Sequence, residues 1–300
     1  MRADLHTHTT ASDGTFTPTE LVRAAREIGL ELLAVTDHDT VAGVAEAQLV
    51  ASEVGLTLLP GVELSAEGAP GKCHLLGLGI DPESPELLET LARLSENRRA
   101  RNEKIVGRLN SLGVSMTYDE VVAVAPPGAN VGRPHFAQLL VKRGIVPDIN
   151  SAFQRYLADD GPAYVEKATL TPAECATLIH GAGGLCFVAH PGLLKLPSHE
   201  TLEARLRAYI SAGVDGIEAY YSQHSPADEA RFLRLAEKYG WPVCGGSDFH
   251  GAAKPHVKLG IVTGGAPLDS AVLKWLASPV SLPRPRTSAT PSPAALRGRG

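Results

Sequence analysis

The sequence predicts an α/β protein in which a largely parallel sheet is interrupted by one helical segment. Short apolar runs rich in β-forming residues alternate with amphipathic stretches along most of the 300 residues. Such alternation is typical of strand–helix–strand units with the helices outside the sheet, and it fits either a barrel or an open doubly wound sheet. Between residues 85 and 167 the pattern is helical throughout, which predicts an insertion of about 80 residues.

Eight apolar runs are the predicted strands, and several of them end in histidine, aspartate or glutamate. They cover residues 2–8, 31–37, 56–64, 73–80, 185–190, 216–221, 242–247 and 259–263. The sequences TPTE (17–20) and TPAE (171–174) mark helix starts, because a capping threonine precedes proline and a glutamate completes the capping box. SPAD (225–228) is a weaker form of the same pattern.

The chain divides into four predicted parts. Residues 1–84 and 168–282 form the two halves of the main domain, and residues 85–167 form the helical insertion. The tail 283–300, PRPRTSATPSPAALRGRG, is rich in Pro, Ser, Arg and Gly and has little apolar surface to bury. This composition predicts disorder in the tail.

Composition and charge limit the classes of partner. Hydrophobic residues make up 44% and charged residues 20% of the chain, as in typical globular domains. The formal charge of −5 argues against binding of long duplex nucleic acid, although bound metal ions would still allow a small anionic substrate. No apolar run is long enough for a membrane span, and the start of the chain lacks a secretory signal. Four scattered cysteines suit a reducing compartment, so we expect a cytoplasmic protein.

Nine imidazole and carboxylate groups fall at or near the predicted strands, most at the carboxyl ends. Residues i and i+2 of a strand share a face, so His6 and His8 present their rings side by side, and Asp248 and His250 repeat this spacing. A lone histidine is more often a hydrogen-bonded core residue, and Asp13 in its Asp-Gly pair is typical of a turn. Apolar strands that end in so many such groups are costly unless something pairs them, which predicts a metal site. The nine residues are His6, His8, Asp13, His38, Glu63, His74, His190, Asp248 and His250.

Nine ligands exceed the coordination number of a single ion. Imidazole and carboxylate donors without thiolate suit Mn, Zn or Fe(II), and affinity order alone does not choose among these metals. We therefore expect two or three divalent metal ions with a carboxylate bridging between them.

Together the motifs resemble those of the polymerase-and-histidinol-phosphatase (PHP) family of metal-dependent phosphoesterases. HTHTTASDG, VTDHDT, GVELS, a histidine after a strand, AHP and GSDFH follow in the family's order from His6 to His250. The arrangement is similar to the subgroup with a helical insertion, which includes 3′,5′-bisphosphonucleoside phosphatases and a 5′-to-3′ exoribonuclease. The resemblance implies a distorted (β/α)7 barrel with a trinuclear metal centre at the carboxyl ends of its strands.

The resemblance also implies which residues hold each ion. The implied sets are His6, His8, Glu63 and Asp248 for the first ion, bridging Glu63 with His74 and His190 for the second, and Asp13, His38 and His250 for the third. Asp37 and Asp39 flank His38 and are expected to face away from it. We expect Asp39 to cap a helix starting at Thr40 and Asp37 to be a supporting group.

The expected nucleophile is a hydroxide bridging two ions, since coordination lowers the pKa of water towards about 7. The sequence has no GxSxG elbow, and strand alternation turns Cys73 away from His74. Asp13, Glu63 and Asp248 are the expected catalytic carboxylates. His224 could protonate the leaving group, bind a second phosphate, or simply cap the helix at Ser225.

Substrate contacts are expected in the insertion and at the barrel rim. Arg98 and Arg101 lie in a charge run that also describes a solvated helix face. Arg133 precedes a helix start and combines a guanidinium fork with free backbone donors. With the resemblance included, the expected substrate contacts are Arg99, Asn102, Arg133, His135, Ser222 and His224.

The predicted activity is hydrolysis of a phosphate monoester of a small nucleotide, with 3′,5′-bisphosphonucleosides such as adenosine 3′,5′-bisphosphate as the leading substrates. A 5′-to-3′ exoribonuclease acting on short 5′-phosphorylated RNA is the closest alternative. A histidinol-phosphatase-like sugar or amino-alcohol phosphatase, an amidohydrolase and a non-catalytic metal-binding module remain open. No lysine lies at a strand end beside the motifs, as the bridging lysine of an amidohydrolase would.

Overall fold

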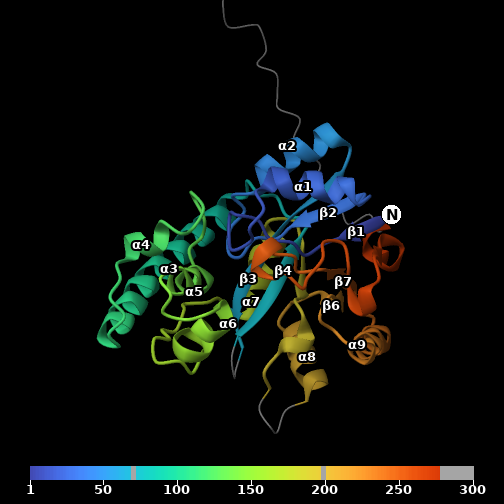
Figure 1. Ribbon diagram of the computed structural model, residues 1–300. Coiled ribbons are helices and arrows are strands. Elements are labelled where there is room, and N and C mark those ends of the chain that lie inside the picture. Colours follow the sequence, from blue (N-terminus) through green and yellow to red (C-terminus); the bar gives the residue numbers. More distant parts are fainter. Residues whose placement is uncertain (69–71, 197–200, 278–300) are drawn as a thin grey trace, which may run out of the picture.

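Eight strands in the described part of the chain form one sheet with the order β7-β6-β5-β4-β3-β2-β1-β8. The computed structural model describes residues 1–68, 72–196 and 201–277. The strands are β1 (Arg2–Asp4), β2 (Leu32–Val35), β3 (Thr57–Glu67), β4 (Lys72–Leu78), β5 (Leu185–Val188), β6 (Gly216–Tyr221), β7 (Val243–Gly246) and β8 (Leu268–Asp269). Figure 1 shows the sheet at the centre of the molecule.

One strand of the main sheet runs against the others. β1, β2 and β3 are parallel, and so are β5, β6 and β7, but β4 is antiparallel to both β3 and β5. β3 and β4 are consecutive, with no helix between them. The amino end of β4 therefore lies beside the carboxyl ends of the parallel strands, where α/β proteins place their active sites.

The segments that follow β1 and β7 pair with each other and nearly close the sheet into a barrel. The amide of Leu5 donates to the carbonyl of Gly245 at 3.1 Å. The amide of His8 donates to the carbonyl of Phe249 at 2.9 Å. The amide of Asp248 donates to the carbonyl of His6 at 2.8 Å. The predicted α/β barrel is thereby confirmed, and its closure brings the first and last ligand motifs together.

Helices cover the outside of the sheet. Those outside the insertion are α1 (Pro18–Glu27), α2 (Val44–Val54), α7 (Pro172–Gly181), α8 (Leu202–Ser211) and α9 (Pro226–Tyr239). In Figure 1, α1 and α2 lie above the sheet and α8 and α9 below it. Thr17, Thr171 and Ser225 form the capping boxes that the sequence predicts.

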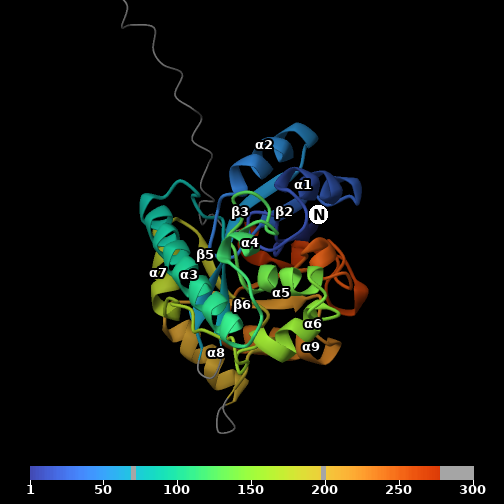
Figure 2. The same ribbon diagram turned by 60° about the vertical axis from the view of Figure 1, so that its left-hand side comes forward.

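The predicted helical insertion is present. It contains α3 (Pro85–Ser111), α4 (Tyr118–Val122), α5 (Arg133–Lys142), α6 (Ile149–Ala152) and a π-helix (Phe153–Leu157). These elements bury a separate hydrophobic cluster that includes Ile105 and Phe136. The first turns of α3 instead pack on the core of the main domain through Leu87 and Leu91, so this helix joins the two cores. Figures 1 and 2 show the insertion on one side of the barrel.

The structure differs from the sequence prediction near the end of the described chain. The strand predicted at 259–263 is wrong, because this stretch forms turns with only an isolated bridge from Ile261 to Pro267. The last strand among the described residues is β8, which pairs antiparallel with β1. The tail 283–300 lies outside the described residues. Among the helices that the structure describes, none is both long and apolar enough to cross a membrane.

The approach of β7 to the segment after β1 depends on glycine. A Cβ on Gly246 would lie 2.3 Å from the amide nitrogen of His6 and 2.4 Å from its Cβ. We expect Gly246→Ala to lower the free energy of unfolding by about 1–3 kcal/mol, measured by urea denaturation. Gly107→Ala is the matched control, since a Cβ there meets nothing within 4 Å and alanine favours the helix by up to about 1 kcal/mol. Equal stability of Gly246→Ala and the parent protein would contradict this account.

Candidate metal centre

The carboxyl ends of the parallel strands and the amino end of β4 bring the nine predicted ligands into one cluster. His6 and His8 follow β1, His38 follows β2, and Glu63 belongs to β3. His74 lies near the start of β4, and the reversed direction of this strand places it at the same end of the barrel as the others. The remaining ligands are Asp13 from the loop before α1, His190 after β5, and Asp248 and His250 after β7.

The buried carboxylate of Glu63 lies at the centre of the cluster. Its Oε1 is 2.9 Å from Nδ1 of His74 and 3.0 Å from Nε2 of His190. Its Oε2 lies 3.0 Å from Nδ1 of His38, 3.2 Å from Nε2 of His8 and 3.3 Å from Nε2 of His6. One carboxylate therefore faces five imidazoles, which suits a group that bridges between ions.

Among the described residues, four groups of side chains place one donor atom each within 4.8 Å of one another. The groups overlap, since His6, His8, His38 and Glu63 each belong to two of them. Compared with the sets implied by the family resemblance, the geometry adds His8 to the group of Asp13, His38 and His250, and it pairs His38 with Glu63 and His74. The ion-by-ion assignment stays a prediction. The groups are His8 with Asp13, His38 and His250; His6 with His8 and Asp248; His6 with Glu63 and His190; and His38 with Glu63 and His74.

The cluster contains ligand-type atoms that make no well-aligned hydrogen bond within the protein, although the carboxylate of Glu63 lies close to several of them. Buried polar atoms without a hydrogen-bond partner are costly and rare in folded proteins. Here seven of them gather in one place, and all are imidazole nitrogens or carboxylate oxygens of the type that binds Mn, Zn or Fe. The residues therefore fit divalent metal ions. The atoms are His6 Nε2, His8 Nδ1 and Nε2, Asp13 Oδ1, His38 Nδ1, Glu63 Oε2 and His74 Nδ1.

At Glu63 and His74 the electrostatics favour the protonation states that metal binding requires. Burial raises the pKa of Glu63, but the imidazoles of His38, His74 and His6 lower it well below its usual value. Burial lowers the pKa of His74 to about 4, against the attraction of Glu63. An ionised carboxylate and a neutral imidazole are the forms that bind a metal. At His6 and His8 burial lowers the pKa, but the surrounding carboxylates raise it above the usual value, so a bound metal ion would have to displace protons there.

Backbone strain is concentrated around the cluster. Of the described residues other than glycine, Asp39, His190 and Asp248 have positive φ angles, of 51°, 31° and 59°. Such conformations cost about 1–3 kcal/mol each and persist where the surrounding contacts impose them. All three residues are predicted ligands or next to one.

Glu218 supports the cluster, a role that is not predicted from the sequence. This fully buried side chain in β6 places Oε1 2.9 Å from Nδ1 of His6 and accepts the amide of His190 on Oε2 at 2.6 Å. A carboxylate on the far nitrogen of a ligating imidazole fixes the orientation of the ring. The available sequence feature was a glutamate inside an apolar strand, GIEAYY.

The second oxygen of Asp248 is held in a similar way. Its Oδ2 accepts the hydroxyl of Tyr221 at 2.8 Å and the ammonium of Lys254 at 2.6 Å. Its Oδ1 faces the imidazoles, 3.3 Å from Nε2 of His8. Asp248 thus presents one oxygen to the predicted metal site, and protein donors neutralise the other.

The two aspartates beside His38 have different partners. Asp37 accepts the amide and hydroxyl of Thr9, both at 2.7 Å, and the hydroxyl of Ser12, and so it holds the loop that leads to Asp13. The helix cap predicted at Asp39 is wrong, because α2 begins at Val44 with Gly43 as its cap. Asp39 is instead buried and accepts from groups far away in the sequence, including Arg98 and Lys167.

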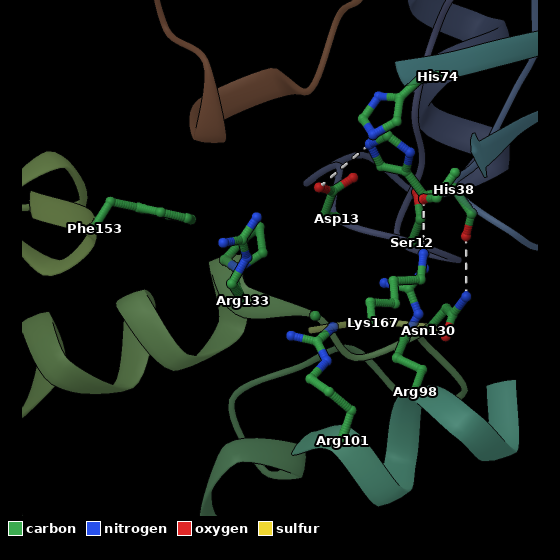
Figure 3. A pocket seen from close by; sticks show the side chains of 13 residues that line it. Ser12, Asp13, His38, His74, Arg98, Arg101, Asn130, Arg133, Phe153 and Lys167 are labelled. Atoms are coloured by element: carbon green, nitrogen blue, oxygen red, sulfur yellow. Dashed lines mark hydrogen bonds and ion pairs between the residues drawn. The ribbon is translucent and has the colours of Figure 1, made fainter. Parts of the chain in front are cut away.

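A basic cavity of about 170 Å³ adjoins the cluster. Figure 3 shows Asp13, His38 and His74 on one side of it, and the basic side chains from the insertion and its return segment on the other. The charge run that contains Arg98 and Arg101 is not a solvated face, since both side chains are buried and line the cavity. The basic lining residues are Arg98, Arg101, Arg133 and Lys167.

Two guanidinium nitrogens of Arg101 make no hydrogen bond within the protein. The residue is only 6% exposed, and its Nε and Nη1 have no hydrogen-bond partner. Burial, with help from Arg98 and Arg133, lowers its pKa to about 10, so it stays charged at neutral pH. A buried cation with unused donors at a cavity wall is suited to bind an anion.

The other predicted contacts in the insertion have different positions. Arg133 lines the cavity, where it donates to the carbonyl of Leu157 and the carboxylate of Asp159, both at 2.8 Å. Arg99 is placed away from the cavity, with a side chain that is 72% exposed and paired with Glu103. The side chains of the remaining two are used within the insertion: Asn102 donates to the carbonyl of Val131, and His135 accepts the amide of Gly132.

The rim residues after β6 do not face the cavity. Nδ1 of His224 donates to the carbonyl of Ala219 at 3.0 Å, and Nε2 accepts the amide of Gly192 at 3.2 Å. Both ring nitrogens are therefore occupied in this structure, where the ring ties the loop after His190 to β6. The roles in proton transfer and phosphate binding stay predictions. Ser222 does not line the cavity, and its hydroxyl is buried without a partner.

The sequence profile of the PHP domain matches residues 4–169. The chain belongs to the PHP domain family. This PHP protein is 35% identical over 247 residues to the 3′,5′-nucleoside bisphosphate phosphatase of Chromobacterium violaceum. The matched region covers 82% of this chain and 86% of that protein. It is also 36% identical over 259 residues to the 5′-3′ exoribonuclease Rnm of Escherichia coli. That match covers 86% of this chain and 87% of the exoribonuclease.

A solved structure has the same fold. It is described as a metal-dependent phosphoesterase of Bifidobacterium adolescentis, and it matches 91% of this PHP protein and 94% of its own chain at a TM-score of 0.82 and 33% identity. The family, the relatives and the clustered side chains together identify the protein as a metal-dependent hydrolase of phosphoric esters.

The position of Glu218 leads to a test of the metal centre. In Glu218→Gln the side chain keeps its size, but it can no longer accept from both His6 and the amide of His190. We expect the affinity for Mn²⁺ to fall about 10- to 100-fold with the fold retained. Calorimetric titration of chelator-treated protein measures the affinity, and circular dichroism checks the fold. Glu237→Gln, on the exposed side of α9, is the control. An unchanged affinity for Mn²⁺ in Glu218→Gln would show that Glu218 does not position the predicted ligands.

Proposed function

We propose that this PHP protein hydrolyses a phosphate monoester of a small nucleotide that carries a second phosphate, with 3′,5′-bisphosphonucleosides as the leading substrates. The observation that supports this choice is the basic cavity directly beside the ligand cluster, with Arg101 buried in its wall and two of its guanidinium nitrogens without a hydrogen-bond partner. A monophosphate bound at the cluster would leave this guanidinium unused. A substrate with two phosphates would occupy both places.

The nine clustered side chains would hold two or three divalent metal ions. When bound, such ions polarise a water molecule for attack and neutralise the oxygens of the phosphate. Glu218 and Tyr221 hold the ligands in position. In the cavity, the free fork of Arg101 would bind the second phosphate by charge-assisted hydrogen bonds. Arg98 and Lys167 are already paired with Asp39, so they contribute less free charge than Arg101.

The relatives support the same class of substrate and name the closest alternative. One is named a nucleoside bisphosphate phosphatase and the other a 5′-3′ exoribonuclease, at nearly equal identity. The 5′ end of a short phosphorylated RNA offers the same two neighbouring phosphates, one terminal and one internal. An exoribonuclease activity on short RNA is therefore the second candidate.

Phosphate release from a panel of compounds tests the proposal. Protein loaded with Mn²⁺, Zn²⁺ or Fe²⁺ should release phosphate faster from 3′,5′-bisphosphonucleosides than from nucleoside monophosphates or sugar phosphates. Rapid hydrolysis of histidinol phosphate with none of the bisphosphonucleosides would overturn it. A labelled oligoribonucleotide separates the second candidate, because a strict phosphatase leaves its chain length unchanged.

Arg101 gives a sharper prediction. Because hydrogen bonds to charged groups contribute about 1.5–3 kcal/mol, Arg101→Met should raise KM for a bisphosphonucleoside by about 10- to 150-fold and leave KM for a monophosphate nearly unchanged. Stability should be equal or higher, since the change removes an unpaired buried charge. Arg93→Met, an exposed position on the same helix, is the control. Equal effects on the two substrates would show that Arg101 does not bind the second phosphate.

A further inference from the structure

Asp39 connects the helical insertion to two ligand-bearing segments of the barrel. Its carboxylate is buried and accepts from both Arg98 of α3 and Lys167 at the end of the insertion. The same carboxylate accepts the amide of Ser65 at 2.8 Å and its hydroxyl at 3.1 Å. Ser65 lies two residues after Glu63 in β3, and Asp39 directly follows His38.

The backbone around Asp39 is tied to the same strand. His38 and Glu63 form an isolated parallel bridge, in which the amide of Asp39 donates to the carbonyl of Glu63 at 3.0 Å. The amide of Glu63 in turn donates to the carbonyl of Asp37 at 3.2 Å. The Asp39 carboxylate and the backbone on both sides of it are therefore held to the same stretch of β3 that carries Glu63.

Asn130 of the insertion also holds the segment that contains His38 and Asp39. The side-chain amide of Asn130 donates to the carbonyl of His38 at 3.0 Å and lies 3.4 Å from that of Asp39. Its backbone amide donates to the carbonyl of Ala11, in the loop that carries Asp13. Figure 3 shows Asn130, Arg98 and Lys167 on one side of the cavity, facing His38.

We infer that Asp39 is a positioning residue through which Arg98 and Lys167 of the insertion hold His38 and Glu63 in place for metal binding. The insertion is then part of the metal centre as well as a wall of the basic cavity. The inference does not depend on the identity of the substrate, because it concerns the ligands alone. Arg98 and Lys167 then hold Asp39 in place, a role separate from their position in the wall of the cavity.

A purely electrostatic role for these cations predicts the opposite sign. Lys167 and Arg98 line the same cavity as His38 and His74. If they acted on bound metal only through their charge, each would repel a divalent cation, and removing one would tighten metal binding. If they hold Asp39 in place, removing one should weaken metal binding. The sign of the change therefore separates the two roles.

The experiment uses Lys167→Met and Arg98→Met in the full-length chain. Each variant keeps one cation to pair with Asp39, so neither leaves the buried carboxylate alone. Chelator-treated protein is titrated with Mn²⁺ in a calorimeter, without substrate and below its own unfolding temperature. Lys167→Arg, which keeps the ion pair, serves as the conservative variant. Arg93→Met is the control for a charge removed from an exposed position on α3.

We expect both methionine variants to bind Mn²⁺ about 10-fold more weakly. Lys167→Arg should recover most of the affinity, and Arg93→Met should match the parent protein. Unchanged or tighter Mn²⁺ binding in Lys167→Met and Arg98→Met would overturn the inference, as would a loss of equal size in Arg93→Met. Because no substrate is present, failure here is distinguishable from failure of the proposed phosphatase activity.

Discussion

The carboxylate of Glu63 is the group around which the rest of the structure is arranged. A buried carboxylate within 3.3 Å of five imidazole nitrogens is costly to desolvate, and it is acceptable only where opposite charge is supplied. Strands on both sides of β3 contribute to that requirement. β1 and β2 supply imidazoles from one side, β5 supplies another, and the reversed β4 supplies His74 from the end at which it begins.

Charge is divided between two adjoining places. The ligand cluster is a set of carboxylates and imidazoles suited to cations, and the basic cavity beside it is lined by arginine and lysine from the insertion and its return segment. Asp39 lies at their boundary and pairs with two of the four basic side chains. The overall charge of −5 conceals this local separation, so net charge alone was a poor guide to the sign of the ligand.

Much of the fold and the composition of the ligand cluster could be predicted from the sequence, because both depend on local patterns. The i, i+2 spacing of His6 and His8 and the polar ends of apolar strands are visible in the letters. The face of a helix residue is not visible where no apolar stripe fixes it. Arg98, Arg99 and Arg101 lie in one charge run, and only packing against the barrel decides that Arg98 and Arg101 turn inward.

Other features that the sequence does not reveal have the same origin in contacts between distant segments. His224 looked available for chemistry, but the carbonyl of Ala219 and the amide of Gly192 occupy its nitrogens. Glu218 looked like one residue of an apolar strand, and its importance depends on His6 at the other end of the chain. The strand predicted at 259–263 had suitable residues but no neighbouring edge to pair with along its length.

The unusual direction of β4 has a consequence for how the molecule is assembled. Glu63 and His74 belong to one antiparallel hairpin, a unit of local contacts that forms within about 1–10 μs in isolated peptides. Asp248 and His250 reach the same place only when the segments after β1 and β7 pair, a contact between opposite ends of the chain that is intrinsically slow to form. Glu63 and His74 are thus brought together by local contacts, and the nine predicted ligands are all assembled only once the barrel has closed. The rate at which metal is taken up during refolding would therefore report on the final step of folding.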